Sequence, residues 1–331
     1  MTDVKTGMTR RLRAALLVAL LAGALAAGAV QGTPASASAH SRAGGPDVLP
    51  SLRPHLVMYY DFDHPVPGDP ARERDRGRSG TDLDLVNGGA AMRVKDHAHR
   101  GSRSALQTRQ VDPQVAGNDD WKAGVYSATG VPTLRAFNGA RQITVMGWFK
   151  RTGEGPAPNS GTADPGDRYN AIGLAGVLTG DSDGHGVRAL LEIINVGGEL
   201  RVVALGRRVD GGASQTFAAD EDWRSILPIG RWVFLAATFD YDQGTMALYK
   251  DGRPLTGFFT VSGDPWGVSG PPEPDLTSPT DPRGIKIGGS FPQNTAERNP
   301  CDCRMDSLMF LDRTVSAQEI WKQYRRMAGR P

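Results

Sequence analysis

The chain of 331 residues carries 38 lysines and arginines against 36 aspartates and glutamates, so its formal net charge at pH 7 is only +2. Because the sequence holds no basic tract, it offers no electrostatic basis for binding nucleic acid or an anionic membrane surface. Only two cysteines occur, which excludes a small disulfide-stabilised scaffold, and 42 glycines with 23 prolines favour turns and strands over helices.

The first 39 residues have the parts of a secretory signal peptide. Arg10, Arg11 and Arg13 precede an Ala/Leu-rich apolar run at 14–30, and small residues follow up to Ala39. This pattern predicts cleavage after Ala39 and a secreted, extracellular protein without a membrane span. A retained membrane anchor is the alternative, although alanine and glycine make the run marginal for the ~20 apolar residues of a span. Cleavage would leave a formal net charge of −1.

Residues 40–54 are polar and rich in proline and glycine, and we interpret them as a flexible lead-in to a domain at 55–328. In this domain, alternating apolar runs bounded by Gly, Pro and Asp turn signals predict β-strands. Strands are expected at 55–62, 83–86, 104–108, 142–150, 171–178, 187–196, 199–206, as a meander within 231–255, and at 258–261, 284–288 and 304–311. Long loops are expected at 153–167, 210–227 and 263–282. About a dozen strands predict an all-β sandwich or jelly roll.

One helix is expected, at the end of the chain. Ser316 and Glu319 form a capping box, in which the serine hydroxyl accepts the Glu319 amide and the carboxylate reaches back. Ile320, Tyr324 and Met327 follow at i, i+4 and i+7 and make an apolar stripe. We expect this helix to cover part of a sheet.

Six sequence blocks follow one another in an order typical of a known family. They are Tyr60–Asp63, Ile143–Trp148, Trp232–Thr238, Leu248–Gly252, Ile285–Gly288 and Met305–Phe310, the last leading into Val315–Ile320. Together they resemble the laminin-G-like modules of the concanavalin A-like lectin/glucanase superfamily. The resemblance implies an antiparallel jelly-roll β-sandwich with a short C-terminal helix. The superfamily contains lectins, protein-binding modules, glycanases and lyases, so the fold does not determine the function.

An enzymatic function finds little support in the sequence. Retaining glucanases need two carboxylates about 5–5.5 Å apart, but the same-face neighbours of Glu192, which are Leu190, Ile194 and Val196, offer no second acid. Residues 121–126 resemble the K-A-G-x-Y strand of some alginate lyases, yet the Gln-x-His motif that those lyases need is missing from the sequence. We therefore predict no catalytic residues, with a polysaccharide-degrading enzyme as the less favoured alternative.

A calcium site is predicted from three aspartates. Asp306 alternates with Leu308 and Phe310, so it points to the apolar side of its strand, where a carboxylate needs a partner. In related jelly rolls the aspartate at this position often binds a structural Ca²⁺, and Asp61 and Asp63 on the opening strand would be its companions. The alternative is that Asp306 accepts hydrogen bonds from loop amides.

Two further pairs of residues are candidate sites. His97 and His99 share a strand face on this interpretation, but zinc would need a third ligand, so a polar face is favoured. Cys301 and Cys303 are expected to oxidise after export. Because Pro300 allows the chain to turn, we predict a local disulfide, with free or intermolecular thiols as the alternative.

Sugar binding would use exposed aromatic rings flanked by hydrogen-bonding groups. Trp223 and Trp266 lie in predicted loops and are the ligand-binding candidates, with packing beneath a long loop as the alternative for both. The overall prediction is a secreted, non-catalytic, lectin-like module that binds an extracellular polysaccharide or glycoconjugate. The alternative is a protein-interaction or envelope-associated module that binds a surface protein.

Overall fold

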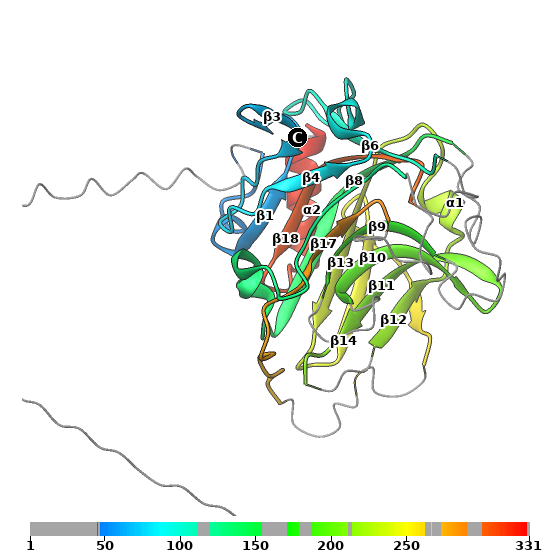
Figure 1. The fold of residues 1–331 in the computed structure, drawn as a ribbon. Coiled ribbons are helices and arrows are strands. Elements are labelled where there is room, and N and C mark those ends of the chain that lie inside the picture. The colour runs from blue at the N-terminus through cyan, green and yellow to red at the C-terminus, as the bar shows by residue number, and fades with distance from the viewer. Residues whose placement is uncertain are drawn as a thin grey trace, which may run out of the picture. The chain divides into compact units, whose positions relative to one another are not determined.

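The computed structural model describes residues 45, 47–111, 120–153, 171–178, 187–210, 214–261, 266, 273–289 and 300–329. These residues belong to the second of two units into which the chain divides, Ser41–Pro331. This unit is built from two antiparallel β-sheets, and Figure 1 shows the helix at the C-terminus packed against one of them. The predicted all-β sandwich is therefore confirmed.

The first sheet, sheet A, contains eight strands. They are β1 (Leu56–Tyr60), β5 (Arg93–Val94), β6 (Ala105–Thr108), β8 (Gln142–Arg151), β13 (Val233–Asp240), β14 (Thr245–Lys250), β15 (Arg253–Pro254) and β18 (Cys303–Leu311). Their order is β15-β14-β13-β8-β18-β6-β5, and β1 also pairs with β18. The β13–β14 hairpin of the predicted meander forms, with Asp240 opposite Thr245.

The second sheet, sheet B, contains ten strands. They are β2 (Pro65–Val66), β3 (Asp69–Glu73), β4 (Leu83–Val86), β7 (Lys122–Tyr126), β9 (Ala171–Leu178), β10 (Val187–Val196), β11 (Glu199–Arg207), β12 (Ser214–Ala219), β16 (Gly257–Phe259) and β17 (Gly284–Ile287). Their order is β16-β12-β11-β10-β9-β17-β7-β4-β3-β2. The helices are α1 (Trp223–Ile226), α2 (Ala317–Ala328) and the 3₁₀ turns η1 (Arg53–His55), η2 (Gly89–Met92) and η3 (Pro132–Phe137).

Every strand expected from the sequence forms, but the segment 210–227 was wrongly predicted as one long loop. It contains β12 and α1. The strand was missed because Phe217 is its one large apolar residue, and its pairing with both β11 and β16 makes it a strand nevertheless. Of the other two predicted long loops, 153–167 lies outside the described residues except for residue 153, and the described part of 263–282, residues 266 and 273–282, contains no helix or strand.

The core has two layers. Apolar side chains of both sheets, such as Phe149, Leu191 and Phe239, pack between the sheets. A second cluster lies on the other face of sheet A, where Ile320 and Met327 of α2 pack with Trp148 and neighbouring apolar residues. The predicted role of the C-terminal helix, to cover part of a sheet, is therefore confirmed.

The end of the segment 40–54, interpreted above as a flexible lead-in, packs on this second cluster. Val48 and Leu52 are fully buried there. The Leu49 amide donates to Oε1 of Gln323 on α2 at 2.8 Å, and Nε2 of Gln323 donates to the Asp47 carbonyl at 2.9 Å. From Asp47 onward the chain therefore belongs to the folded unit, because its apolar side chains find a partner in α2.

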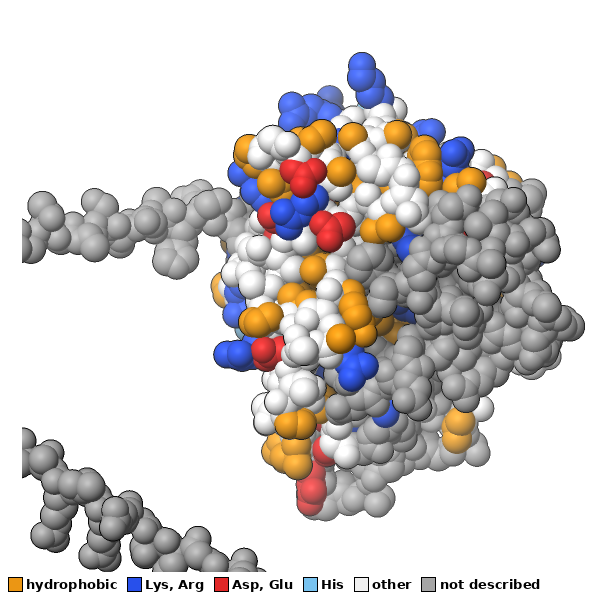
Figure 2. Space-filling view, in the orientation of Figure 1, with side chains coloured by type: hydrophobic (Ala, Val, Ile, Leu, Met, Phe, Trp, Pro, Cys, Tyr) orange, Lys and Arg blue, Asp and Glu red, His pale blue; other side chains and the backbone are white. Residues whose placement is uncertain are grey.

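The surface carries charges of both signs. Figure 2 shows Lys and Arg side chains distributed over the described part of this face, between apolar and acidic groups, and not gathered into one basic patch. No helix among the described residues is long and apolar enough to cross a membrane.

Candidate functional site

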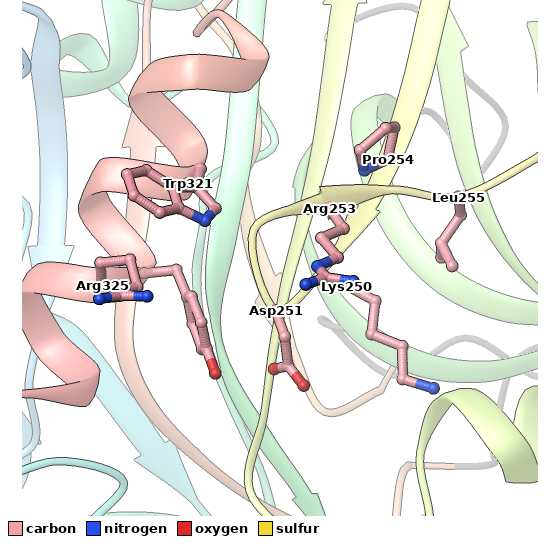
Figure 3. A pocket seen from close by; sticks show the side chains of 8 residues that line it. Lys250, Asp251, Arg253, Pro254, Leu255, Trp321 and Arg325 are labelled. Carbon is pink, nitrogen blue, oxygen red and sulfur yellow. The ribbon is translucent and has the colours of Figure 1, made fainter. Parts of the chain in front are cut away.

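A groove with a volume of about 450 Å³ lies between the turn after β14 and helix α2, and we call it the hairpin–helix groove. The residues that line it are Lys250, Asp251, Arg253, Pro254, Leu255, Trp321, Tyr324 and Arg325. Figure 3 shows Trp321 and Arg325 on the helix facing Arg253 and Asp251 on the turn. Its size falls in the ~300–1,000 Å³ range of small-molecule sites.

The sequence Asp251-Gly252 determines how closely the turn approaches the helix. Both residues have positive φ, +49° for Asp251 and +78° for Gly252, as tight hairpin turns require. A Cβ atom on Gly252 would lie 2.9 Å from the Trp321 Cα and 3.3 Å from the Tyr324 Cβ. Glycine therefore serves two purposes here, the turn conformation and the contact with α2.

The two aromatic residues of the groove have different roles. Tyr324 packs against the rings of Trp148 and Phe234, with centroids 5.7 and 6.1 Å away, and so fixes the helix to sheet A. Trp321 lies off the buried stripe of the helix and is 43% exposed. The guanidinium of Arg325 lies 5.1 Å from its ring centroid. The indole therefore offers an exposed aromatic surface at the groove.

Three cations and one acid surround this aromatic surface. Oδ1 of Asp251 accepts the Phe234 amide at 3.0 Å, so part of its charge is engaged with the backbone. Nζ of Lys250 donates to Oε1 of Glu221 and to the Ser225 carbonyl, at 3.1 and 2.8 Å. Among the described residues, Arg253 has no ion-pair partner. The groove therefore combines an aromatic ring with charged hydrogen-bond donors, of which Arg253 is not held in an ion pair within the part of the chain described.

A second groove of about 470 Å³ lies beside α1, and we call it the α1 groove. The residues that line it are Gly198, Glu199, Leu200, Arg201, Asp220, Asp222, Trp223 and Arg224. Asp222 caps α1, because its Oδ2 accepts the amides of Arg224 and Ser225 at 2.9 and 3.1 Å. Most of the lining is thus polar.

The two tryptophans predicted to bind sugar are both buried. Trp223 is 2% exposed and lies against the guanidiniums of Arg151 and Arg224, 4.6 and 4.7 Å from its ring centroid. Trp266 is 7% exposed, lies 5.0 Å from the Tyr241 ring and donates Nε1–H to the Gly206 carbonyl. The ring faces of these two buried indoles are not available for stacking on a sugar. Both tryptophans therefore pack in the protein interior, which was the alternative to sugar binding.

The three aspartates of the predicted calcium site each have other partners. Asp306 is fully buried, and its carboxylate accepts the Ala98 amide and the Ser307 hydroxyl, both at 3.0 Å. Burial raises the pKa of Asp306 to about 7. Asp61 forms an ion pair with Arg76, and Asp63 accepts the Arg103 amide at 3.0 Å. The contact of Asp306 with the Ala98 amide is the kind that the alternative to calcium expects, and the calcium site stays a prediction.

The structure groups Asp61 with His64 and Glu73, which the sequence did not suggest. Their ligand atoms lie within 4.8 Å of one another, as in a metal site. Oε1 of Glu73 accepts the His64 amide at 3.0 Å, while Oε2 accepts from Arg93 at 2.6 Å. Burial raises the pKa of Glu73 to about 7. Because Arg76 and Arg93 already balance both carboxylates, the cluster is explained by ion pairs.

The remaining candidates have structural roles. Cys301 and Cys303 form a disulfide with Cα atoms 5.0 Å apart, and both are buried. His99 is buried and its Nε2 lies 2.9 Å from the Ser307 hydroxyl, whereas His97 is exposed, so the two do not share a face.

Glu192, the one acid considered for catalysis, lies on β10 and is 2% exposed. Its partners on the neighbouring strands are Val203 and Gly173. The sheet therefore places no acid beside it in either ladder. Lys122 of the K-A-G-x-Y segment is buried on β7, which lowers its pKa to about 8, and Tyr126 is partly exposed.

The hairpin–helix groove was not predicted from the sequence, although one signal was present. Trp321 falls off the stripe of Ile320, Tyr324 and Met327 that predicts the buried face of the helix. An indole on the polar face of an amphipathic helix is exposed unless another element covers it. Nothing in the sequence indicated that Lys250 and Arg253 belong to the groove, because their position opposite this helix depends on the tertiary fold.

Comparison with known proteins adds information on the fold. No protein-family model matches the chain, and no curated protein matches it. Similar solved structures include Trypanosoma rangeli sialidase in complex with the inhibitor DANA, at 14% identity and a TM-score of 0.46 over 82% of this chain and 32% of that one. The botulinum neurotoxin type G receptor binding domain has 9% identity and a TM-score of 0.46 over 82% of this chain and 51% of that one.

A structure described as HCR/D-Sa-GBL1/C has 9% identity and a TM-score of 0.50 over 83% of this chain and 52% of that one. The chain thus spans about a third of the sialidase and about half of the other two proteins. At these identities the similarity shows the fold alone. The resemblance to laminin-G-like modules therefore stays a prediction, while the two-sheet sandwich is shared with solved proteins.

Proposed function

We propose that the chain is a secreted, non-catalytic module that binds an extracellular glycan in the hairpin–helix groove. The observation that carries this proposal is the exposed indole of Trp321, which lies in a groove among hydrogen-bonding side chains. Proteins bind sugars by stacking the apolar face of the ring on an aromatic side chain while polar groups bind the hydroxyls. Trp321 provides the first element, and Arg253 and Lys250 provide the second.

The absence of paired acids among the residues lining the groove supports a binding function over hydrolysis. Hydrolysis of a glycosidic bond ordinarily requires two carboxylates. Asp251 is the one acid among these lining residues. Elsewhere in the described sheets, Glu192 has Val203 and Gly173 beside it. The disulfide Cys301–Cys303 is also in keeping with export, since disulfides persist in oxidising compartments.

The test is a glycan array followed by titration calorimetry with the best ligand, on the wild type and on Trp321→Ala. We expect the variant to bind roughly tenfold more weakly, because an aromatic stacking contact contributes on the order of 1 kcal/mol. The melting temperature should not change, since the indole is exposed. Tyr126→Ala is the matched control, because it removes another partly exposed aromatic ring outside the groove.

Three outcomes would contradict parts of the proposal. Unchanged affinity of Trp321→Ala would exclude the hairpin–helix groove as the site. An array without any bound glycan would exclude sugar binding, and the protein-interaction alternative would replace it. Release of reducing ends or of unsaturated sugars from mixed polysaccharides would exclude the non-catalytic assignment.

A further inference from the structure

We propose that the hairpin–helix groove and the α1 groove form one continuous surface, which binds a linear oligosaccharide over several sugar units and not a single terminal sugar. The inference rests on the proposed function and specifies the ligand. Each groove alone has a volume in the lower half of the ~300–1,000 Å³ range of small-molecule sites. A chain-like ligand would occupy both.

One side chain connects the two grooves. Lys250 lines the hairpin–helix groove, and Figure 3 shows it extending away from Trp321. Its Nζ donates to Glu221 and to the Ser225 carbonyl. Glu221 lies between Asp220 and Asp222 in the sequence, and both of these line the α1 groove. Glu221 and Ser225 flank Asp222, Trp223 and Arg224, which line the α1 groove, so Lys250 reaches from the hairpin–helix groove to the edge of the α1 groove.

The α1 groove has the polar groups that bind sugar hydroxyls. Nη1 of Arg201 donates to the carbonyls of Ala219 and Asp220, both at 2.9 Å, and its Nη2 pairs with Glu199 at 2.5 Å, so the guanidinium is held in place. The Glu199 side chain is 71% exposed, and Asp220 is exposed without a side-chain partner among the described residues. Such carboxylates accept hydrogen bonds from neighbouring hydroxyls, and a fixed guanidinium donates to them.

The charges of the two grooves indicate what kind of chain binds. The hairpin–helix groove has more cations than acids, whereas the α1 groove has three acids and two arginines. A polymer with a negative charge on every unit would be attracted to the first groove and repelled by Glu199, Asp220 and Asp222 in the second. The geometry therefore favours a glycan with neutral units over the α1 groove.

The experiment measures affinity against chain length by titration calorimetry. The probes are malto-, cello-, xylo- and chito-oligosaccharides from the disaccharide to the octasaccharide, with heparin oligosaccharides as the polyanion. For the series that binds, we expect affinity to increase about tenfold from the shortest to the longest member. Heparin fragments should show no such increase.

Variants separate this inference from the proposed function. Asp220→Ala should remove most of the gain of long oligosaccharides and leave short ones unchanged, whereas Trp321→Ala should weaken binding at every length. Glu273→Ala is the control, because Glu273 is an exposed acid outside both grooves. Equal affinity at all lengths, with no effect of Asp220→Ala, would overturn the continuous surface but not the proposed function. If no series binds, both are overturned.

Discussion

At the level of single residues, burial separates Trp223 and Trp266, which build the fold, from Trp321, for which ligand binding is proposed. Trp223 and Trp266 lie in segments that the sequence predicts to be loops, and yet they are 2% and 7% exposed, with Trp223 at the start of the short helix α1. Trp321 lies within a regular helix and is 43% exposed. An indole in a loop is removed from water when it covers a core, because burial of its apolar area stabilises the fold. Position in a loop is therefore a poor criterion for a sugar-binding aromatic.

Asp306 gives a prediction about pH. Because burial raises the pKa of Asp306 to about 7, its contribution to stability is complete below the ordinary aspartate pKa of ~3.9 and is lost as the pH rises through 7. Asp306→Asn cannot ionise, so the free energy of unfolding of this variant should fall less between pH 4 and 7 than that of the wild type. Urea unfolding of wild type and variant across this pH range measures the difference.

The predicted calcium site at Asp61, Asp63 and Asp306 can be tested by the effect of calcium on thermal stability. On the contacts of Asp306, Asp61 and Asp63, we expect the melting temperature to be the same in EDTA and in excess calcium. An increase in melting temperature with calcium would show that these carboxylates exchange their hydrogen-bond donors for the ion.

The pH prediction for Asp306 has its own contradicting outcome. If the free energy of unfolding of wild type and of Asp306→Asn changed in parallel from pH 4 to 7, the pKa of Asp306 would not be raised.

At the level of secondary-structure elements, the groove exists because a hairpin turn and a helix far apart in the sequence are in close contact. The helix is set by its capping box, in which the Ser316 hydroxyl accepts the Glu319 amide at 3.3 Å. The Arg313 guanidinium holds Glu319 and lowers the pKa of its carboxyl to about 2. The turn is set by Asp251-Gly252. Neither element forms a binding surface by itself.

Gly252→Ala tests the contact between these elements. The added Cβ meets the helix at 2.9 Å in a residue with φ of +78°, so we expect a loss of ~1–2 kcal/mol in stability together with a loss of glycan binding. Gly230→Ala is the matched control, since Gly230 has φ of +75° and a Cβ atom there would meet no other atom within 4 Å. It should lose less stability than Gly252→Ala, because it has the backbone strain without the contact with the helix, and it should keep glycan binding. Unaltered binding in Gly252→Ala would show that the groove tolerates separation of turn and helix.

At the level of the whole molecule, one cluster between the sheets and another beneath α2 hold the sandwich together. Val48 and Leu52 already belong to the second cluster, so the folded unit begins a few residues after the predicted cleavage site. We propose that residues 1–39 are an export signal. The expected disulfide and the near-neutral mature charge fit an extracellular protein.

Export has a direct measurement. Expressed with its first 39 residues in a secreting host, the protein should be found in the medium with His40 as its N-terminus. Its intact mass should be two hydrogens lower than that of the reduced chain, because Cys301 and Cys303 are joined. Recovery of the full-length chain in the membrane fraction would support the retained anchor instead.

The sequence alone determined the longer strands other than β12, the C-terminal helix and the all-β class, because alternation, turn residues and capping act between neighbours in the chain. The β10–β11 hairpin at Gly197-Gly198 and the helix starting after Ser316 are examples. Only the tertiary structure decided that Trp223 and Trp266 are buried, that Asp306 binds amides, and that Lys250 and Arg253 lie near Trp321. These burials and positions depend on contacts between segments that are distant in the sequence. Their free energy comes from apolar surface that both segments bury together, so no local sequence pattern predicts it.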